Sequence, residues 1–439
     1  MTNITQVSTA LQNVFGTQAD QLAHTTKFIQ RQVKVTGSQF AQTLVFGFLD
    51  NPKMSYREMR EVAGMTGLQI TGQGLEQKFS PASAKFMQAL LGQAVKQLVQ
   101  SSPGIDLDLL NRFSQIHIQD GSVIGLPDEC IAVWQGLRPK DTKGCSAVKL
   151  HVSVEYKTGQ LSGPVLANGR EHDKKSPWAA QTLQPGALRI ADLGFFDLDQ
   201  LAADAQAGGF WITRHKHEVI LEQNGQALAL LAFLQAQTTS QLDVPVHLGK
   251  NHQIPCRLLI FKADEQIAEK RKEKLREYAR KKGVTLSEER LQLAHWTLFL
   301  TNAPQNLLSP LEVFALYRLR WQIELLFRLW KTYSFIDESE CKNPWRVLTE
   351  LYAKLIAVLI QHWLLLVSVW FIPNKSMVHA ARRIHKFAFL LLFALLDASA
   401  LSATISKIVS TLEASPDLLK RKKNPSNFQV LTEPSLALR

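Results

Sequence analysis

Between residues 116 and 126 the sequence reads Ile-His-Ile-Gln-Asp-Gly-Ser-Val-Ile-Gly-Leu. The β-branched and aliphatic residues in this stretch predict a β-strand with Asp120 inside it. An acidic side chain in a strand interior is costly unless it has a function, which makes Asp120 a candidate site residue. Two more strands are expected directly afterwards, at residues 148–156 and 161–166, with a turn at Gly159 between them.

The next segment alternates between strand and helix patterns. Residues 187–193 have a strand pattern with Asp192 near its end, residues 198–207 a helical pattern, and residues 210–214 a strand pattern again. Three consecutive strands followed by strand, helix and strand predict an α/β fold with a mixed sheet. Asp192 becomes the second candidate acid, because sheets of this kind build their sites at the carboxyl ends of strands. Three other aspartates compete for the two roles: Asp106, Asp128 and Asp197.

A long helix is expected from residue 311 to about residue 333. At about 100° per residue, four of its polar side chains fall within about 60° of one another. They are Tyr317, Arg320, Glu324 and Lys331. A carboxylate between two cations suits a phosphodiester, since it can hold Mg²⁺ while the cations neutralise the phosphate oxygens. A surface stripe of helix salt bridges is the alternative, because Arg320 and Glu324 are four residues apart.

The spacing of these four residues carries a family resemblance. Tyr317-x2-Arg320-x3-Glu324-x6-Lys331 resembles the Y-R-E-K signature of bacterial insertion-sequence transposases of the DDE class. The likeness extends from about residue 116 to residue 363. It implies an α/β fold: an RNase H-like mixed sheet with helices, interrupted by a β-rich insertion and flanked by helical N- and C-terminal regions.

The resemblance also implies a chemistry. Asp120, Asp192 and Glu324 would be the catalytic acids, and they would hold two Mg²⁺ or Mn²⁺ ions through oxygen ligands. The activity would be cut-and-paste DNA transposition by a polynucleotidyl transferase and endonuclease. Its steps would be hydrolysis at the transposon ends, a hairpin step, and strand transfer by attack of a 3′-hydroxyl.

The same resemblance indicates the DNA contacts. Tyr317, Arg320 and Lys331 would bind phosphate groups, and Tyr317 is not expected to act as a nucleophile. Trp296 and Trp321 resemble tryptophans that stack on a base swung out of the duplex, an interaction worth about 1–3 kcal/mol per base. Apart from the resemblance, the residues themselves favour core aromatics at both positions.

Five regions are expected along the chain. They are a helical N-terminal DNA-end-binding region (1–105), a split RNase H-like core (106–215 and 296–345), a β-rich insertion with a charged helix (216–295), an apolar helical C-terminal region that is a candidate dimerisation surface (346–415), and a basic tail expected to be disordered (416–439). In the first region, a capping box at Ser55 begins a helix-turn-helix-like segment that extends to Lys78, although a plain helical bundle fits as well. The charged helix at 264–282 is either a solvated face or a contact with DNA phosphate.

Composition and charge agree with a DNA partner. The 50 Lys and Arg residues exceed the 38 Asp and Glu residues, which gives a net charge of +12 and a tendency to attract polyanions. We therefore expect double-stranded DNA as the partner, both terminal inverted repeats and target DNA, and the resemblance adds a homodimer in a synaptic complex. Four scattered cysteines without a C-x-x-C pair, and a polar N-terminus, predict a cytoplasmic, nucleoid-associated protein.

Three alternatives compete with such an enzyme. The apolar stretch 351–372 is almost long enough to cross a membrane, but Lys354, Gln361 and His362 interrupt it, so a buried helix and no membrane are expected. An RNase H-like nuclease or resolvase that cuts without joining would not be expected to combine the insertion with the Y-R-E-K stripe. A catalytically silent DNA-binding regulator would not be expected to keep all three acids.

Overall fold

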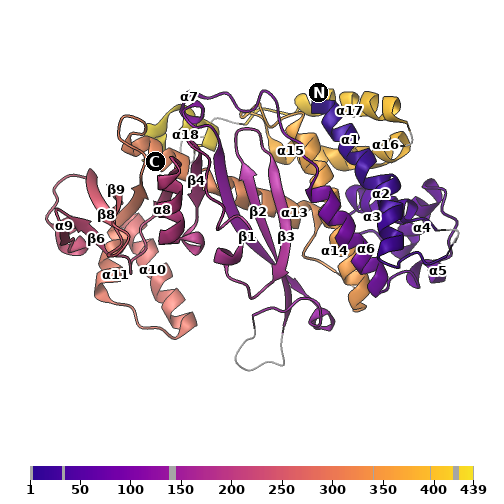
Figure 1. Ribbon diagram of the computed structural model, residues 1–439, viewed down its shortest axis with the longest axis horizontal. Coiled ribbons are helices and arrows are strands. Elements are labelled where there is room, and N and C mark those ends of the chain that lie inside the picture. The colour runs from indigo at the N-terminus through magenta and orange to yellow at the C-terminus, as the bar shows by residue number, and fades with distance from the viewer. Residues whose placement is uncertain are drawn as a thin grey trace. The chain divides into compact units, whose positions relative to one another are not determined.

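The computed structural model (Figure 1) describes residues 3–31, 35–137, 145–339, 341–395, 397–418 and 425–438. Its contacts divide the chain into two compact units. Unit 1 consists of Met1–Asp106, Gln119–His172 and Trp321–Lys420, and unit 2 of Leu107–Ile118, Asp173–Arg320 and Arg421–Arg439. These units cut across the five predicted regions: strand β1 (Ile116–Leu126) and helix α13 (Arg320–Ser334) both pass from one unit into the other.

The mixed sheet predicted from the sequence is present. Its strand order is β3-β2-β1-β4-β5-β10-β9-β8-β6-β7. The first five strands along the chain are β1 (Ile116–Leu126), β2 (Ser146–Glu155), β3 (Leu161–Asn168), β4 (Leu188–Ala191) and β5 (Phe210–Arg214). β2 and β3 are antiparallel, whereas β4 and β5 are parallel. The start of β1 lies beside β4, where the Leu188 amide donates to the Gln115 carbonyl at 2.8 Å.

The segment predicted as a β-rich insertion adds its strands to the same sheet. β10 (Trp296–Thr301) pairs antiparallel with β5 on one side and with β9 on the other. The remaining elements here are β6 (Leu221–Gln223), β7 (Gln226–Ala227), α9 (Leu230–Gln235), β8 (Gln241–Leu248), β9 (Ile254–Lys262), α10 (Glu265–Lys282), α11 (Glu288–Gln292) and the short helix η4 (Leu293–His295). Trp211 of β5 and Leu258 of β9 belong to one buried cluster, so the two parts share a hydrophobic core.

Unit 1 is built largely from helices. Those before the sheet are α1 (Asn3–Phe15), α2 (Thr17–Thr25), α3 (Gly37–Asp50), α4 (Tyr56–Met65), α5 (Gly72–Glu76) and α6 (Pro81–Val95). Those after it are α14 (Pro344–Leu366), α15 (Met377–Ile384), α16 (Ala388–Ala394) and α17 (Ala398–Glu413). α14 packs against α3 and α6, and Figure 1 shows α14 beside α6. The apolar C-terminal region therefore shares a core with the N-terminal helices.

Helix α14 contains the apolar stretch that raised the membrane question. Among the described residues it is the one helix that is long and apolar enough to cross a membrane, and that window is wholly buried. Its polar interruptions find partners inside the unit. Lys354 donates to the Phe335 carbonyl at 3.0 Å, Gln361 to the Ala381 carbonyl at 3.0 Å, and the His362 imidazole lies 2.8 Å from the Gly159 carbonyl oxygen. The expectation of a buried core helix is consistent with this packing.

The helix-turn-helix-like outline is present in shortened form. The Ser55 amide donates to the Glu58 carboxylate at 2.6 Å, and the Glu58 amide to the Ser55 hydroxyl at 3.4 Å, which confirms the capping box at the start of α4. Gly67, with φ of +77°, follows α4 in the left-handed region that glycine tolerates. The second helix, α5, has only five residues. Ser80 and Pro81 begin α6 as predicted.

The helix expected over residues 311–333 is interrupted. α12 (Pro310–Tyr317) ends before α13 begins at Arg320. The amides of Arg318 and Leu319 donate to carbonyls three residues back, at 3.2 and 2.9 Å, so the backbone tightens there. Tyr317 therefore lies on a different helix from the residues that were expected to share its stripe.

The expectation of a disordered tail is wrong for residues 425–438. Residues of this segment form α18 (Asn427–Thr432) and the short helix η6 (Pro434–Leu438). Val430 is fully buried against Ala315 of α12, and the Pro425 carbonyl accepts from Arg318 at 3.1 Å. The burial of a few apolar side chains is enough to stabilise these short helices, although the composition of the basic tail is largely polar. The basic run at 420–423 lies outside the described residues.

Unit 2 also contains two short helices, α7 (Asp108–Asn111) and α8 (Leu198–Gln206).

Candidate active site

The second predicted acid lies at the carboxyl edge of the sheet in unit 2. β4 ends at Ala191, and Asp192 is the first residue after it, half-buried. β5 runs parallel to β4 and ends at Arg214. Because parallel strands end at the same edge, the Asp192 carboxylate and the Arg214 guanidinium are brought to one side of the sheet. This is the position from which an acid was expected to act.

The charged groups near that edge of the sheet act on the phenol of Tyr317. Its ring packs against Phe299 of β10 with 4.9 Å between centroids. Burial and, to a lesser extent, the Asp192 carboxylate raise the pKa of the phenol to about 12, although Arg320 and Arg214 act to lower it. The phenol is therefore a neutral hydrogen-bonding group throughout the physiological range. Within unit 2 the structure thus brings together Asp192, Tyr317 and Arg320, three of the residues predicted from the sequence.

Arg214 is a functional candidate that the sequence reasoning missed. Its side chain is exposed, and its charge acts on both Tyr317 and Arg271. A partial signal was available, since Arg214 ends the strand predicted at 210–214, which is the next predicted strand after the one with Asp192 near its end. A cation at that position is well placed to bind an anion beside the acid.

The other two acids belong to unit 1. Asp120 is half-buried in β1, where its carboxylate accepts from the Gly121 amide at 2.8 Å. Glu324 is half-buried on α13, seven residues before Lys331. Seven residues turn a helix by about 700°, so the two side chains differ by only about 20° and share a face. Lys331 donates to the Val123 carbonyl of β1 at 3.1 Å, so the face of α13 that carries Glu324 is turned toward the strand that carries Asp120.

The competing aspartates have other surroundings. Burial alone would raise the pKa of Asp197, but a hydrogen bond and ion pair with Lys174 at 2.9 Å, together with two helix amides, lower it. Asp197 is the N-cap of α8 and so has a structural role. Asp106 and Asp128 are exposed. These surroundings favour Asp192 for the role at the end of β4.

The two predicted tryptophans differ sharply in exposure. Trp296 is 8% exposed, belongs to the core shared by β5 and β9, and lies beneath the Lys262 ammonium at 5.6 Å. Trp321, the second residue of α13, is 51% exposed. An indole must be accessible to stack on a base, and in the described structure Trp321 is accessible whereas Trp296 is buried.

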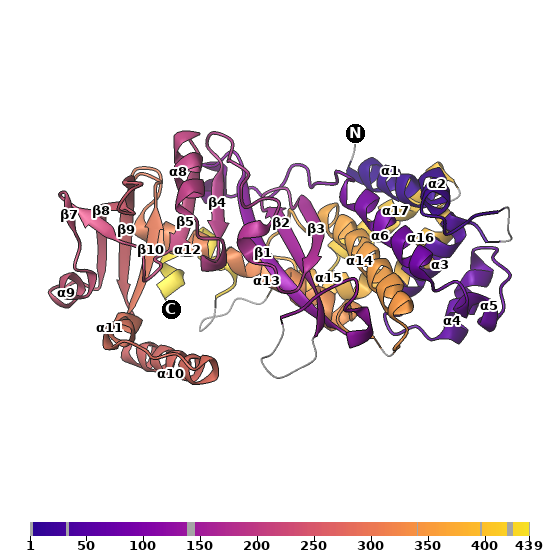
Figure 2. The same ribbon diagram turned by 60° about the horizontal axis from the view of Figure 1, so that its bottom comes forward.

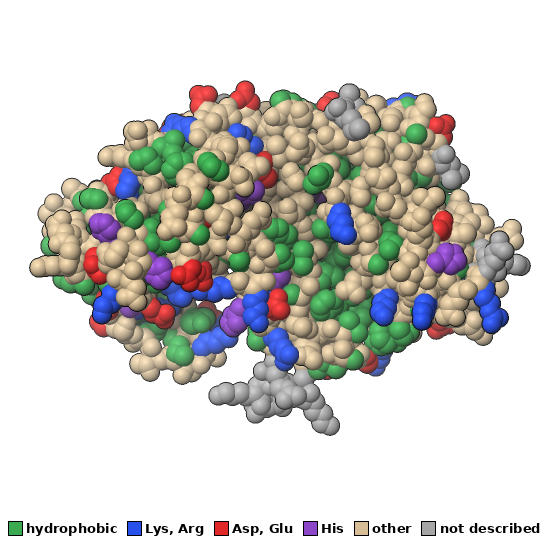
Figure 3. All heavy atoms as spheres, viewed as in Figure 1, with side chains coloured by type: hydrophobic (Ala, Val, Ile, Leu, Met, Phe, Trp, Pro, Cys, Tyr) green, Lys and Arg blue, Asp and Glu red, His purple; other side chains and the backbone are tan. Residues whose placement is uncertain are grey.

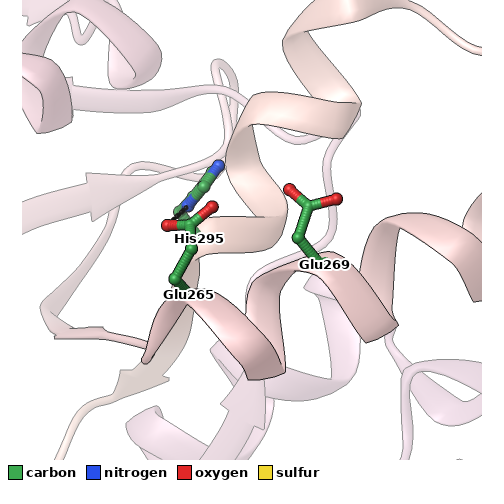
Figure 4. Close-up of side chains that lie close together, drawn as sticks. All are labelled: Glu265, Glu269 and His295. Atoms are coloured by element: carbon green, nitrogen blue, oxygen red, sulfur yellow. Dashed lines mark ion pairs between the residues drawn. The ribbon is translucent and has the colours of Figure 1, made fainter.

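A separate group of possible ligands lies on the insertion side of unit 2. Glu265 and Glu269 of α10 and His295 of η4 place one ligand atom each within 4.8 Å of one another (Figure 4). The His295 ring nitrogen is 3.5 Å from the Glu265 carboxylate, whereas Glu269 is held by Lys272 at 2.7 Å, which lowers its pKa. None of the predicted acids belongs to this group. Its ion pairs explain the arrangement as an attachment of α10 to η4.

Comparisons with known proteins agree with the predicted family and with its fold. Residues 112–360 match the family described as Transposase DDE domain. The chain is similar to the transposase for insertion sequence element IS231B of Bacillus thuringiensis subsp. berliner, with 24% identity over 367 residues that cover 78% of this chain and 75% of that protein.

Two further relatives carry the same kind of name. The transposase for insertion sequence element IS231F of Bacillus thuringiensis subsp. israelensis is 26% identical, over 77% of this chain and 75% of that protein. The transposase for insertion sequence element IS1151 of Clostridium perfringens is 24% identical, over 80% of this chain and 78% of that protein. The mixed sheet with its helices fits an RNase H-like core. The chain belongs to the transposase DDE domain family, whose members are DNA-acting enzymes that use divalent metal ions.

Proposed function

We propose that this protein is a cut-and-paste transposase in which Asp120, Asp192 and Glu324 act together as ligands of two Mg²⁺ or Mn²⁺ ions. The observation that carries the proposal is the charge arrangement around Tyr317. An acid, two guanidinium groups and a neutral phenol lie at the end of β4 and β5. An arrangement of one acid with two arginines is suited to a further anion, and a DNA phosphate supplies it.

The acids suit such a metal chemically. Carboxylate oxygens are the ligands that Mg²⁺ and Mn²⁺ prefer, and half-buried side chains retain access to an incoming ion. When bound, divalent ions would activate the attacking oxygen and stabilise the leaving oxygen of an in-line displacement. The exposed group formed by Glu265, Glu269 and His295 is less suited to catalysis, because Lys272 already neutralises Glu269.

The remaining residues of the signature bind and orient the DNA. Arg320 and Arg214 pair with non-bridging oxygens of the phosphate, and the neutral Tyr317 phenol donates a hydrogen bond without competing for a metal. Lys331 lies on the face of α13 that carries Glu324 and adds positive charge there. Trp321, with its exposed ring, stacks on a base swung out of the duplex during the hairpin step.

The proposed partners are the inverted repeats that end a transposon and a target duplex, brought together by two copies of the protein in a synaptic complex. We assign recognition of the transposon ends to the N-terminal region through α4 and α5. Deleting that region is not a usable test, because α3 and α6 cover α14 and their loss would expose its apolar surface. Substitution of the exposed Arg57 and Arg60 on α4 tests the assignment instead.

The central test separates DNA cleavage from DNA binding. Asp120→Asn, Asp192→Asn and Glu324→Gln should each reduce cleavage at a transposon end more than a hundredfold in Mg²⁺, while the affinity for the uncut end stays within about threefold. Removing one ligand empties the metal site but leaves most of the binding surface. Asp128→Asn and Asp197→Asn are matched controls and should cleave at near the wild-type rate. If a control variant loses cleavage and one of the three acids does not, the catalytic acids are assigned incorrectly.

A further inference from the structure

Helix α10 of unit 2 is fixed to the sheet along one side. Arg271 donates to the carbonyls of Ala294 and Trp296, both at 3.3 Å, and to the Thr297 hydroxyl at 2.9 Å. Ala268 and Ala279 are buried on the same side of the helix. Figure 2 shows α10 lying beyond the ends of β9 and β10, with its length turned across them. The opposite side of the helix is exposed.

That opposite side carries a row of lysines. Lys270, Lys274 and Lys281 lie within about 40° of one another, roughly opposite the buried alanines, and all three are exposed. The ring of Tyr278, 51% exposed, lies next to them. Figure 3 shows Lys and Arg side chains on the surface in the region of α10. We call Lys270, Lys274 and Lys281 the lysine stripe.

The helix does not neutralise its own charge. It carries eight Lys and Arg residues against four Glu residues. A solvated helix face usually pairs opposite charges at three or four residues. Here the recorded pairs are Lys272 with Glu269 and Lys281 with Glu277, each at 2.7 Å. Within the described part of the chain, no ion pair is recorded for Lys270 or Lys274.

The lysine stripe also belongs to the same unit as the charges at the end of β4. Burial lowers the pKa of Arg271, and the nearby Arg214 lowers it further. Arg214 in turn acts on Tyr317, next to Asp192. A series of cations therefore leads from the acid to α10 within unit 2. At about 1.5 Å per residue, the stripe itself extends for roughly 16 Å from Lys270 to Lys281.

We propose that α10 binds the phosphate backbone of the duplex next to the cleaved bond, with the lysine stripe as its contact surface. The inference rests on the proposed function and adds a binding surface to it. A duplex carries one negative charge per roughly 1.7 Å of its axis, so a stripe of this length can meet several phosphates. Lysine side chains reach phosphates without reading bases, so the contact contributes affinity for any sequence.

The test is the salt dependence of DNA binding. The triple variant Lys270→Gln, Lys274→Gln, Lys281→Gln is compared with wild type on a transposon-end duplex and on a random duplex of equal length. The slope of log K against log salt is negative, and each lost phosphate contact should lower its magnitude by about 0.9, so we expect the magnitude to decrease by about 2 to 3 on both duplexes. Cleavage at saturating protein should stay within about threefold of wild type.

A matched control removes the same charge elsewhere. The triple variant Lys250→Gln, Lys386→Gln, Lys407→Gln replaces three exposed lysines that do not belong to α10. Its slope should change by less than about 1, because those lysines contact no phosphate. An equal decrease in both triple variants would show an effect of net charge alone and would overturn the proposal.

A variant that is expected to bind DNA more tightly shows that a change in affinity does not come from misfolding. Glu273 and Glu277 lie on the exposed side of α10, so Glu273→Gln, Glu277→Gln should raise affinity for both duplexes several-fold at low salt. If wild type neither binds nor cleaves DNA in Mg²⁺, the proposed function itself fails. If wild type binds and cleaves but neither α10 variant changes affinity or slope, the function stands and the assignment of α10 is refuted.

Discussion

The buried ion pair between Arg189 of β4 and Asp204 of α8 leads to a quantitative prediction. The two side chains are 7% and 0% exposed, and the Arg189 guanidinium donates to the Asp204 carboxylate at 2.6 Å. The same carboxylate accepts from the Leu183 amide at 2.9 Å and from the Gln200 side chain at 3.0 Å. These bonds hold the strand whose end carries Asp192.

Asp204→Ala removes an acceptor that the neighbours cannot replace. The Arg189 charge would remain buried without its partner, which costs about 3–5 kcal/mol. The Leu183 amide would lose its acceptor, at about 1–3 kcal/mol. Since these costs overlap in part, we expect the free energy of unfolding of unit 2 to fall by about 4–6 kcal/mol. Urea denaturation followed by circular dichroism measures the loss.

Two further variants make the reasoning refutable. Asp199→Ala, on the same helix but with a side chain 92% exposed, should change the free energy of unfolding by less than about 0.5 kcal/mol. Arg189→Met with Asp204→Leu removes both charges, so it should recover all but about 1–3 kcal/mol of the loss. If Asp204→Ala costs less than about 1 kcal/mol, or if the double variant is as unstable as the single one, the ion pair does not hold β4 as described.

Three more predictions follow from the structure. Burial lowers the pKa of His362 to about 4, so between pH 6.5 and 4 the imidazole binds a proton only in the unfolded chain. The free energy of unfolding should therefore fall by up to about 3 kcal/mol as pH decreases through that window. His362→Gln should reduce this pH dependence, as measured by urea denaturation. Trp321→Ala should slow hairpin closure by roughly ten- to a hundredfold and leave first-strand nicking near normal, whereas Trp296→Ala should lower stability by about 3–5 kcal/mol and reduce both steps together. A chelator should stop cleavage, and added Mg²⁺ or Mn²⁺ should restore it; full turnover in chelator would contradict the metal ligands.

The strands of the core could be predicted because their signals are local. The run around Asp120 and the segment that ends at Asp192 have strand compositions that tertiary contacts reinforce, and the structure has strands at both places. The capping box at Ser55 is equally local, since both partners lie within one turn. Glu324 was selected from its spacing to Tyr317, Arg320 and Lys331, which is also a local property of the sequence.

Other features depend on contacts that the sequence does not show. No Gly or Pro marks the break between α12 and α13. The apolar period also continues through it, since Leu316 and Leu319 are both fully buried, so the sequence predicts one continuous helix. The ordered tail depends on the surface of α12, against which Val430 packs. Arg214 became a candidate only when its strand was placed beside the strand that ends at Asp192.

A strand-joining assay tests most directly whether this protein is a transposase that joins DNA as well as cutting it. Purified protein is incubated in Mg²⁺ with a precleaved transposon end and a target plasmid, and covalent joining of the 3′ end to the plasmid is measured. We predict joined product from wild type, none when the end carries a 3′-deoxy terminus, and none from Asp192→Asn, which should still bind DNA. Cleavage of transposon ends without any joined product would identify a nuclease of the same fold and contradict the account.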